Sequence, residues 1–184
     1  MRKSCVPNIF TFINLSFGIL SIIETHNGNY RLASIFIIAA ALVDRYDGRI
    51  ARFLQVSSDL GKELDSLADL VSFGVAPSIL VFLLFDLNSY GPFGIIGIII
   101  LLLFPICGAY RLARYNAVSF DGVFTGVPIT VVGCFIAILA LLSFKYTIAP
   151  TLLVILMLIG SYLMVSNLKS VSYTHLTLPT IYSV

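Results

Sequence analysis

Long apolar segments recur along the whole chain and constrain its fold more than any other feature. Of the 184 residues, 59% are hydrophobic and only 11% are charged. A helix needs about 20 mostly apolar residues to cross the hydrocarbon core of a bilayer. Six segments approach this length, roughly 8–25, 32–53, 62–86, 93–115, 124–143 and 147–168. The sequence therefore predicts an all-α, polytopic membrane protein with six transmembrane helices, built as one domain over residues 1–170.

The basic residues predict how these helices are oriented. With six spans and the N-terminus inside, all but two of the 11 Lys and Arg residues fall in inner segments, the exceptions being Arg31 and Lys145. Such an excess is expected of cytoplasmic loops. We therefore expect a multi-pass protein of the cell's inner membrane, with its polar helix ends facing the cytoplasm. A formal net charge of +2 is too small to indicate a nucleic-acid partner.

Six of the nine carboxylates lie between Asp44 and Asp69. Acidic side chains are unfavourable in or near a bilayer unless they are paired, bind a metal or face an aqueous cavity. Asp44 and Asp47 share one face of a helix, and Asp65 and Asp69 share a face of the next. If the two helices run antiparallel, these four carboxylates can meet in one cavity. Oxygen donors in this number suit two Mg²⁺ or Mn²⁺ ions rather than zinc or copper.

Three residues near the carboxylates suit a ligand that carries phosphate. Gly48 and Gly61 leave room at the cavity wall, and Arg52 offers a fork of donors for a phosphate oxygen. An interhelical salt-bridge network is the simpler explanation of any single Asp–Arg pair. It does not explain Asp65 and Asp69, which lie with Gly61 on an i, i+4, i+8 stripe that holds no basic residue. A divalent-cation transporter is a more remote alternative, because it would spread its acids through the membrane depth on several spans.

The pattern Asp-x2-Asp-Gly-x2-Ala-Arg-x8-Gly-x3-Asp-x3-Asp begins at Asp44. It resembles the signature of the CDP-alcohol phosphotransferase family at every specified position, and that family's six-helix membrane topology agrees with the span count. The resemblance implies that two divalent cations are held by Asp44, Asp47, Asp65 and Asp69, and that Asp69 is also the general base. It further implies a pocket for the CDP group lined by Gly48, Ala51, Arg52 and Gly61, with Ser58 as a further candidate.

Flanking segments resemble the bacterial members of this family that use L-serine as the acceptor. These segments are 7–14, 65–77, 111–116, 124–128 and 161–166. The resemblance implies CDP-diacylglycerol and L-serine as substrates and a bilayer that holds the acyl chains. Members are often dimers, so a homodimer is an assembly that the resemblance allows. The chain departs from the pattern at Thr130, where many relatives have a second proline.

Several assignments within these segments stay open. By resemblance, Asn8 and Thr11 belong to the nucleotide pocket. A role as caps of the first helix explains them equally well. Arg111 and Arg114 are candidates for binding the acceptor, although cations are expected at the inner end of a span in any case. The main alternative keeps the fold and changes the acceptor to glycerol 3-phosphate or an inositol compound. A phosphorylated acceptor should need more cations than these two arginines.

The last part of the sequence differs abruptly from the rest. Residues 171–184 resemble translated adapter or cloning sequence. We therefore expect this tail to be non-native. Its histidine, His175, is therefore not a candidate site residue.

Overall fold

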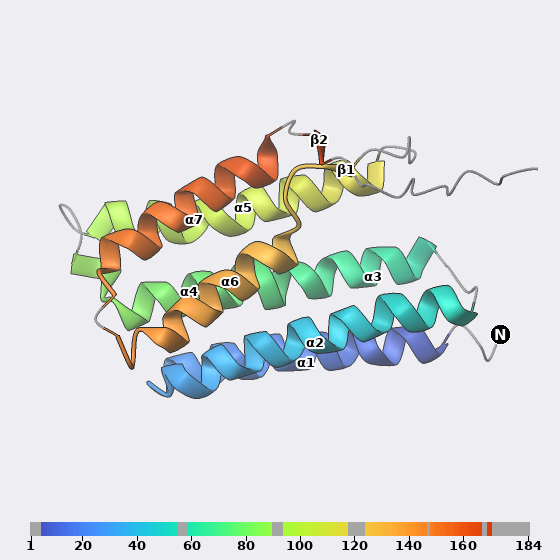
Figure 1. The fold of residues 1–184 in the computed structure, drawn as a ribbon, viewed down its shortest axis with the longest axis horizontal. Helices are drawn as coiled ribbons and strands as arrows, with labels where there is room; N and C mark the ends of the chain where they lie inside the picture. Colours follow the sequence, from blue (N-terminus) through green and yellow to red (C-terminus); the bar gives the residue numbers. More distant parts are fainter. Residues whose placement is uncertain are drawn as a thin grey trace, which may run out of the picture.

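The structure is a computed structural model that describes residues 5–54, 59–89, 94–117, 124–146, 148–166 and 169–170. Within these ranges, the side chains of 5–7, 47–54, 59, 124–125 and 169–170 lie outside the description. Long helices run side by side along the longest axis of the molecule (Figure 1). They are α1 (Cys5–His26), α2 (Tyr30–Leu54), α3 (Asp59–Asp69), α4 (Ala76–Leu84), α5 (Ile95–Ala117), α6 (Ile129–Leu142) and α7 (Pro150–Val165). A π-helix (Leu70–Val75) joins α3 to α4, and a short 3-10 helix (Leu87–Ser89) follows α4.

The predicted helical architecture is confirmed, with one local difference. The helix predicted over 124–143 begins only at Ile129, because residues 124–125 form a strand and the chain then turns at Gly126, whose φ is 78°. This strand, β1 (Phe124–Thr125), pairs antiparallel with β2 (Lys169–Ser170). The two-residue pair is the departure from an all-α fold within the described residues. It ties the start of α6 to the segment that follows α7.

Several helices within the described residues have the length and the apolar surface of membrane spans. Three of them are long and apolar enough to cross a membrane, over Asn8–His26, Leu60–Leu84 and Ile95–Ala117, while α6 and α7 are apolar but shorter. Helix α2 is long, but its C-terminal half carries many charged residues. Large apolar side chains are exposed along the outer faces, for example Ile95, Ile96, Ile98, Ile99, Leu102 and Ile106 of α5. Apolar helices with exposed surface of this extent are those of a multi-pass membrane protein.

Helix α1 is the support on which the first half of the molecule is assembled. It packs along α2 and also contacts α3, the π-helix and α4. Helix α5 packs along α7, and α6 lies against both α2 and the π-helix, as the arrangement in Figure 1 shows. The π-helix is therefore enclosed by α1, α5 and α6, and its residues Ser72, Phe73 and Gly74 are buried. The span formed by α3, the π-helix and α4 runs through the centre of the bundle.

The π-helix has a local cause in the sequence. The backbone N–H of Ala76 donates to the carbonyl of Val71, five residues earlier, which is the bond that defines a π-turn. Pro77 follows directly and has no N–H, so it cannot bond the carbonyl of Phe73 as an ordinary α-helical residue would. A proline inside a helix commonly bends it. The structure accommodates Pro77 by widening the turn before it.

Two glycines on neighbouring helices allow the π-helix to pack closely. A Cβ on Gly18 of α1 would lie 2.9 Å from the Cα of Ser72. A Cβ on Gly133 of α6 would lie 2.8 Å from the Cα of Phe73 and still closer to its carbonyl oxygen. Real side-chain carbons do not approach a backbone so closely, so only glycine fits at these two contacts. Close packing of α1 and α6 against the π-helix thus depends on glycine, which has no side chain, at positions 18 and 133.

Replacing Gly133 with alanine tests this contact. Alanine should improve helix propensity by about 1 kcal/mol, but its clash with the Phe73 backbone should cost about 1–3 kcal/mol. We expect Gly133→Ala to lower the thermal unfolding midpoint of the purified protein in detergent. The control is Val131→Leu, which adds bulk on the same helix where the side chain is 57% exposed. Equal midpoints for Gly133→Ala and the parent would contradict the proposed close contact.

Candidate active site and metal centre

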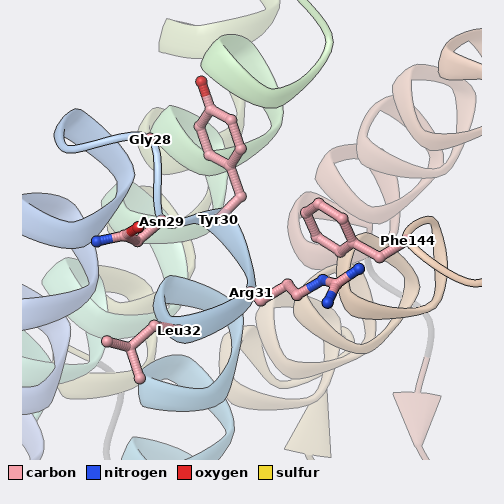
Figure 2. Close-up of a pocket in the computed structure, with 6 residues that line it drawn as sticks. All are labelled: Gly28, Asn29, Tyr30, Arg31, Leu32 and Phe144. Carbon is pink, nitrogen blue, oxygen red and sulfur yellow. The ribbon is translucent and has the colours of Figure 1, made fainter.

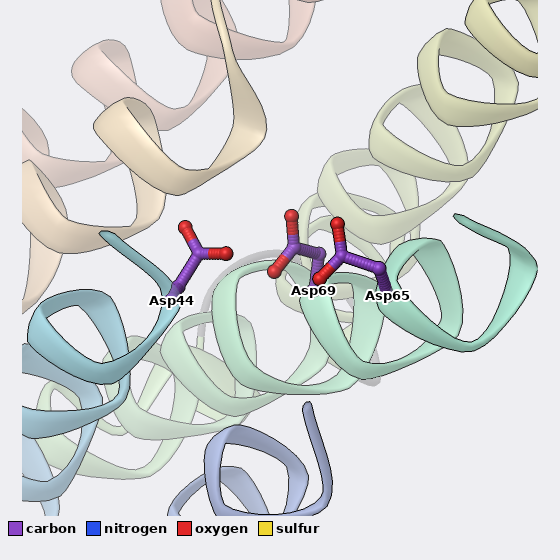
Figure 3. A group of neighbouring side chains, drawn as sticks. All are labelled: Asp44, Asp65 and Asp69. Carbon is purple, nitrogen blue, oxygen red and sulfur yellow. The ribbon is translucent and has the colours of Figure 1, made fainter. Parts of the chain in front are cut away.

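Three carboxylates from two helices converge at one place in the bundle. Asp44 extends from α2, and Asp65 and Asp69 extend toward it from α3 (Figure 3). One oxygen of each carboxylate lies within 4.8 Å of the corresponding oxygen of the other two. Asp69 is buried at 8% exposure, whereas Asp44 and Asp65 are half-buried. The structure thus brings together three of the four aspartates that the sequence singled out.

The arrangement depends on the directions of α2 and α3. The two helices run antiparallel, since α2 ends at the same end of the molecule at which α3 begins (Figure 1). Both helices pack against α1, which holds them at a fixed separation. Asp47 lies on α2 one turn after Asp44, but its side chain is outside the described residues. Its part in the cluster therefore stays a prediction.

The three carboxylates fit a hard divalent cation. Like charges this close repel one another strongly in a partly buried site, and a cation between them would reverse that repulsion. Oxygen ligands lie about 2.0–2.1 Å from Mg²⁺, so two ligands on opposite sides of the ion are about 4.2 Å apart. The observed limit of 4.8 Å needs only a small side-chain rotation to reach this value. Asp44, Asp65 and Asp69 can therefore hold a metal ion.

Two further residues contact Asp69, and the sequence did not identify either as a site residue. The amide nitrogen of Asn14 on α1 donates a hydrogen bond of 3.1 Å to Asp69 Oδ1. The hydroxyl of Thr130, in the first turn of α6, donates a longer bond of 3.5 Å to Asp69 Oδ2. Asn14 belongs to a segment that drew attention only for its resemblance to the nucleotide pocket. Thr130 was noted only as a departure from the usual proline.

The residues predicted for the nucleotide pocket are placed unevenly. Asn8 and Thr11 lie inside α1, which includes Cys5, so neither is a helix cap, and Thr11 is 4% exposed. Gly61 lies in the first turn of α3 and is half-buried. The remaining candidates are outside what the structure describes: Gly48, Ala51 and Arg52 have only their backbone placed on α2, and Ser58 is not described at all.

The two candidate arginines on α5 differ in their surroundings. The half-buried guanidinium of Arg111 interacts electrostatically with the carboxylate of Asp69. Its buried Nε has no hydrogen-bond partner in the described part of the chain. Arg114 instead donates from Nη1 to the carbonyl of Val165, at 3.2 Å, and so ties α5 to the end of α7. The interaction with Asp69 and the commitment of Arg114 to Val165 make Arg111 the better candidate of the two to meet a ligand at the carboxylates.

A cavity elsewhere in the molecule is separate from the carboxylates. It has a volume of about 500 Å³ and is lined by Gly28, Asn29, Tyr30, Arg31, Leu32 and Phe144 (Figure 2). The guanidinium of Arg31 lies over the ring of Phe144, 4.9 Å from its centre. Arg31 and Asp44 are 13 positions apart on α2, which places them about 20 Å apart along the helix. This cavity thus belongs to the opposite half of the bundle from the acidic cluster.

Comparison with known proteins identifies the family. The profile of the CDP-alcohol phosphatidyltransferase family matches residues 4–167. This chain belongs to that family. The CDP-diacylglycerol–serine O-phosphatidyltransferase of Bacillus subtilis is 41% identical over 167 residues, which cover 89% of this chain and 88% of the relative. The Helicobacter pylori enzyme of the same name is 36% identical over 171 residues, covering 89% and 70%.

An archaeal relative extends the comparison. The archaetidylserine synthase of Methanothermobacter thermautotrophicus is 33% identical over 168 residues, covering 89% of this chain and 68% of the relative. Membership of the CDP-alcohol phosphatidyltransferase family makes this chain an enzyme, and the family match extends across α1 to α7. The acidic motif that resembles this family's signature includes Asp44, Asp65 and Asp69, the three carboxylates that converge in the structure.

Removal of one carboxylate from the cluster tests metal binding by this family member. We expect Asp65→Asn to weaken Mn²⁺ binding by at least about tenfold, since even loss of a residue that supports a ligand typically costs 10–100-fold. Binding is measured on the purified protein by electron paramagnetic resonance of free Mn²⁺. The matched control is Asp86→Asn, an exposed carboxylate after α4 that is remote in sequence from the motif. Unchanged Mn²⁺ affinity in Asp65→Asn would show that the cluster is not the metal site.

Proposed function

We propose that this enzyme transfers the phosphatidyl group of CDP-diacylglycerol to the hydroxyl of L-serine and releases CMP. The observation that carries the proposal is the convergence of Asp44, Asp65 and Asp69 in a chain that is 36% and 41% identical to two bacterial enzymes named for serine transfer. The apolar outer surface supports it as well. A donor with two acyl chains can stay in the lipid while its diphosphate reaches the polar cluster.

Metal ions are part of the proposal. Two divalent cations, Mg²⁺ or Mn²⁺, held by Asp44, Asp47, Asp65 and Asp69, would neutralise the diphosphate and stabilise the charge on departing CMP. The donor set supports hard cations because it consists of carboxylate oxygens. The number of ions, two, is an assignment of the proposal.

Asp69 is assigned as the general base. Its carboxylate would accept the proton of the serine hydroxyl as that oxygen attacks the phosphorus attached to diacylglycerol. A new bond between the serine oxygen and phosphorus forms, the bond between that phosphorus and the oxygen of CMP breaks, and the proton passes to Asp69. Its burial and its hydrogen bonds to Asn14 and Thr130 support a carboxylate held in one orientation.

The remaining residues are assigned to the two substrates. We assign the CDP group to a pocket that includes Asn8, Thr11, Gly48, Ala51, Arg52, Ser58 and Gly61. Arg111 is assigned to the serine carboxylate, since a guanidinium binds a carboxylate through two parallel hydrogen bonds. Its charge interaction with Asp69 supports a place beside the base. Arg114 is a weaker member of this group because it already donates to the carbonyl of Val165.

The proposed orientation puts the active site at the cytoplasmic face of the inner membrane. The distribution of basic residues along the sequence supports this orientation. The Arg31 cavity lies at the start of α2, and the carboxylates lie further along this helix. A homodimer is a further proposal, which the mass of the purified protein in detergent would test.

The acceptor is tested by a panel of labelled alcohols. The purified enzyme is incubated with CDP-diacylglycerol, Mn²⁺ and one of L-serine, glycerol 3-phosphate or inositol. We expect label in lipid and stoichiometric CMP release with serine, and neither with the other two. Label entering lipid from another alcohol but not from serine would overturn the acceptor while leaving the family intact.

The base is tested by Asp69→Asn. This change keeps the shape of the side chain but removes its ability to accept a proton, so we expect turnover to fall by about 10²–10⁴-fold. Because Asp69 is also a proposed metal ligand, Mn²⁺ affinity should fall by about tenfold, which is less than the loss of turnover. The control is Glu63→Gln, which changes an exposed carboxylate on the same helix. Full turnover in Asp69→Asn would remove the proposed base.

A further inference from the structure

Asn14 connects Asp69 to a different helix from those that supply the carboxylates. Its amide nitrogen donates to Asp69 Oδ1 at 3.1 Å across 55 residues of sequence. The side chain is 1% exposed, so this contact is shielded from water. A hydrogen bond to an ionised group is stronger than one between neutral groups, and burial strengthens it further. Asn14 therefore has a defined influence on where the Asp69 carboxylate points.

The backbone of Asn14 is fixed to the same stretch of chain. Ser72 Oγ, in the first turn of the π-helix, donates to the carbonyl oxygen of Asn14 at 3.0 Å. One turn further along α1, Gly18 allows Ser72 to approach closely, as described above. Side chain and backbone of Asn14 thus contact Asp69 and Ser72, which lie on either side of the change from α-helix to π-helix. Such double attachment leaves the amide little freedom to move.

The two ends of the Asn14 amide have different environments. A carboxylate only accepts hydrogen bonds, so the nitrogen of the amide must face Asp69 and the oxygen must face away. That oxygen, Oδ1, is buried and has no hydrogen-bond partner within the described residues. An apolar side chain of similar size would avoid burying an unpaired acceptor. The contact with Asp69 is therefore the feature that an asparagine provides here and a leucine would not.

We propose that Asn14 is a positioning residue that holds the Asp69 carboxylate in the orientation in which it binds metal and accepts the proton. The proposal rests on the proposed function for the second of these roles. Partners that orient a metal ligand typically contribute 10–100-fold to affinity or activity. Thr130 contacts the other oxygen of Asp69, but at 3.5 Å its bond is long and should contribute less. Asn14 is thus the main fixed contact of Asp69 on α1.

The test compares Asn14→Leu and Asn14→Ala with the full-length parent. Leucine retains most of the volume and removes the amide, so it should preserve the thermal unfolding midpoint. For both variants we expect the dissociation constant for Mn²⁺ to rise by about tenfold or more and kcat to fall by roughly 10–100-fold, with the KM for the alcohol unchanged. Mn²⁺ binding is measured by electron paramagnetic resonance without substrate. A purely structural role would lower the unfolding midpoint and leave metal affinity per folded molecule unchanged.

The matched control is Ser16→Ala, which removes an exposed hydroxyl on α1 that bonds only locally, to the carbonyl of Phe12. It should leave Mn²⁺ affinity, kcat and stability unchanged. Parent-like Mn²⁺ affinity and kcat in Asn14→Leu would overturn the proposal, as would failure of both Asn14 variants to fold. Because Mn²⁺ binding needs no acceptor, the Asn14 effect should persist even if the parent uses an alcohol other than serine. The two proposals therefore fail independently.

Discussion

The structure must overcome the mutual repulsion of three neighbouring carboxylates, and the packing of its helices serves this purpose. Asp44, Asp65 and Asp69 lie within 4.8 Å of one another, in a bundle whose other surfaces are largely apolar. Carboxylates can lie this close when packing elsewhere holds their helices in place, and a cation between them would offset their repulsion. Helix α1 supplies that packing because it contacts α2 on one side and α3 and the π-helix on the other. The close fit of Gly18 and Gly133 against the π-helix adds to the same support.

The same packing gathers several buried polar side chains beside the carboxylates of this lipid enzyme. Asp69, Asn14 and Ser72 are buried together where α1 meets the central span. The side chains that face outward on α5 are apolar. In the proposed function, substrate chemistry thus takes place on a short length of α2 and α3, and the exposed apolar side chains are available to contact acyl chains. Arg111 brings a positive charge to the edge of this polar region from α5.

Sequence reasoning predicted the features that depend on local pattern. Hydrophobic length predicted the helices, and the spacing of Asp44, Asp65 and Asp69 predicted helical faces that meet. It did not predict contacts made by residues that have other common roles. Asn14 lies in a helix among apolar residues, and only the packing of α1 shows that its amide reaches Asp69. The sequence singled out Thr130 only because many relatives have a proline at this position.

Other differences arise from backbone geometry. The late start of α6 follows from the turn at Gly126 and the short β pair, in which β1 bonds to residues more than forty positions later. A hydropathy pattern does not reveal such long-range pairing. Pro77 did indicate an irregular helix, but a kink and a widened turn have the same sequence signal.

The widened turn has a consequence for how one membrane span can serve two purposes. Each residue in an α-helix advances the side chains by about 100°, so one additional residue in a turn offsets everything beyond it by that angle. The pattern of α3 and the pattern of α4 are therefore out of phase, although they belong to one continuous rod. In a regular helix of equal length, the face that α3 turns to the bundle would fix the face that α4 turns to it. The offset at Leu70–Val75 allows the acidic residues of α3 and the apolar residues of α4 to face different directions around the helix axis.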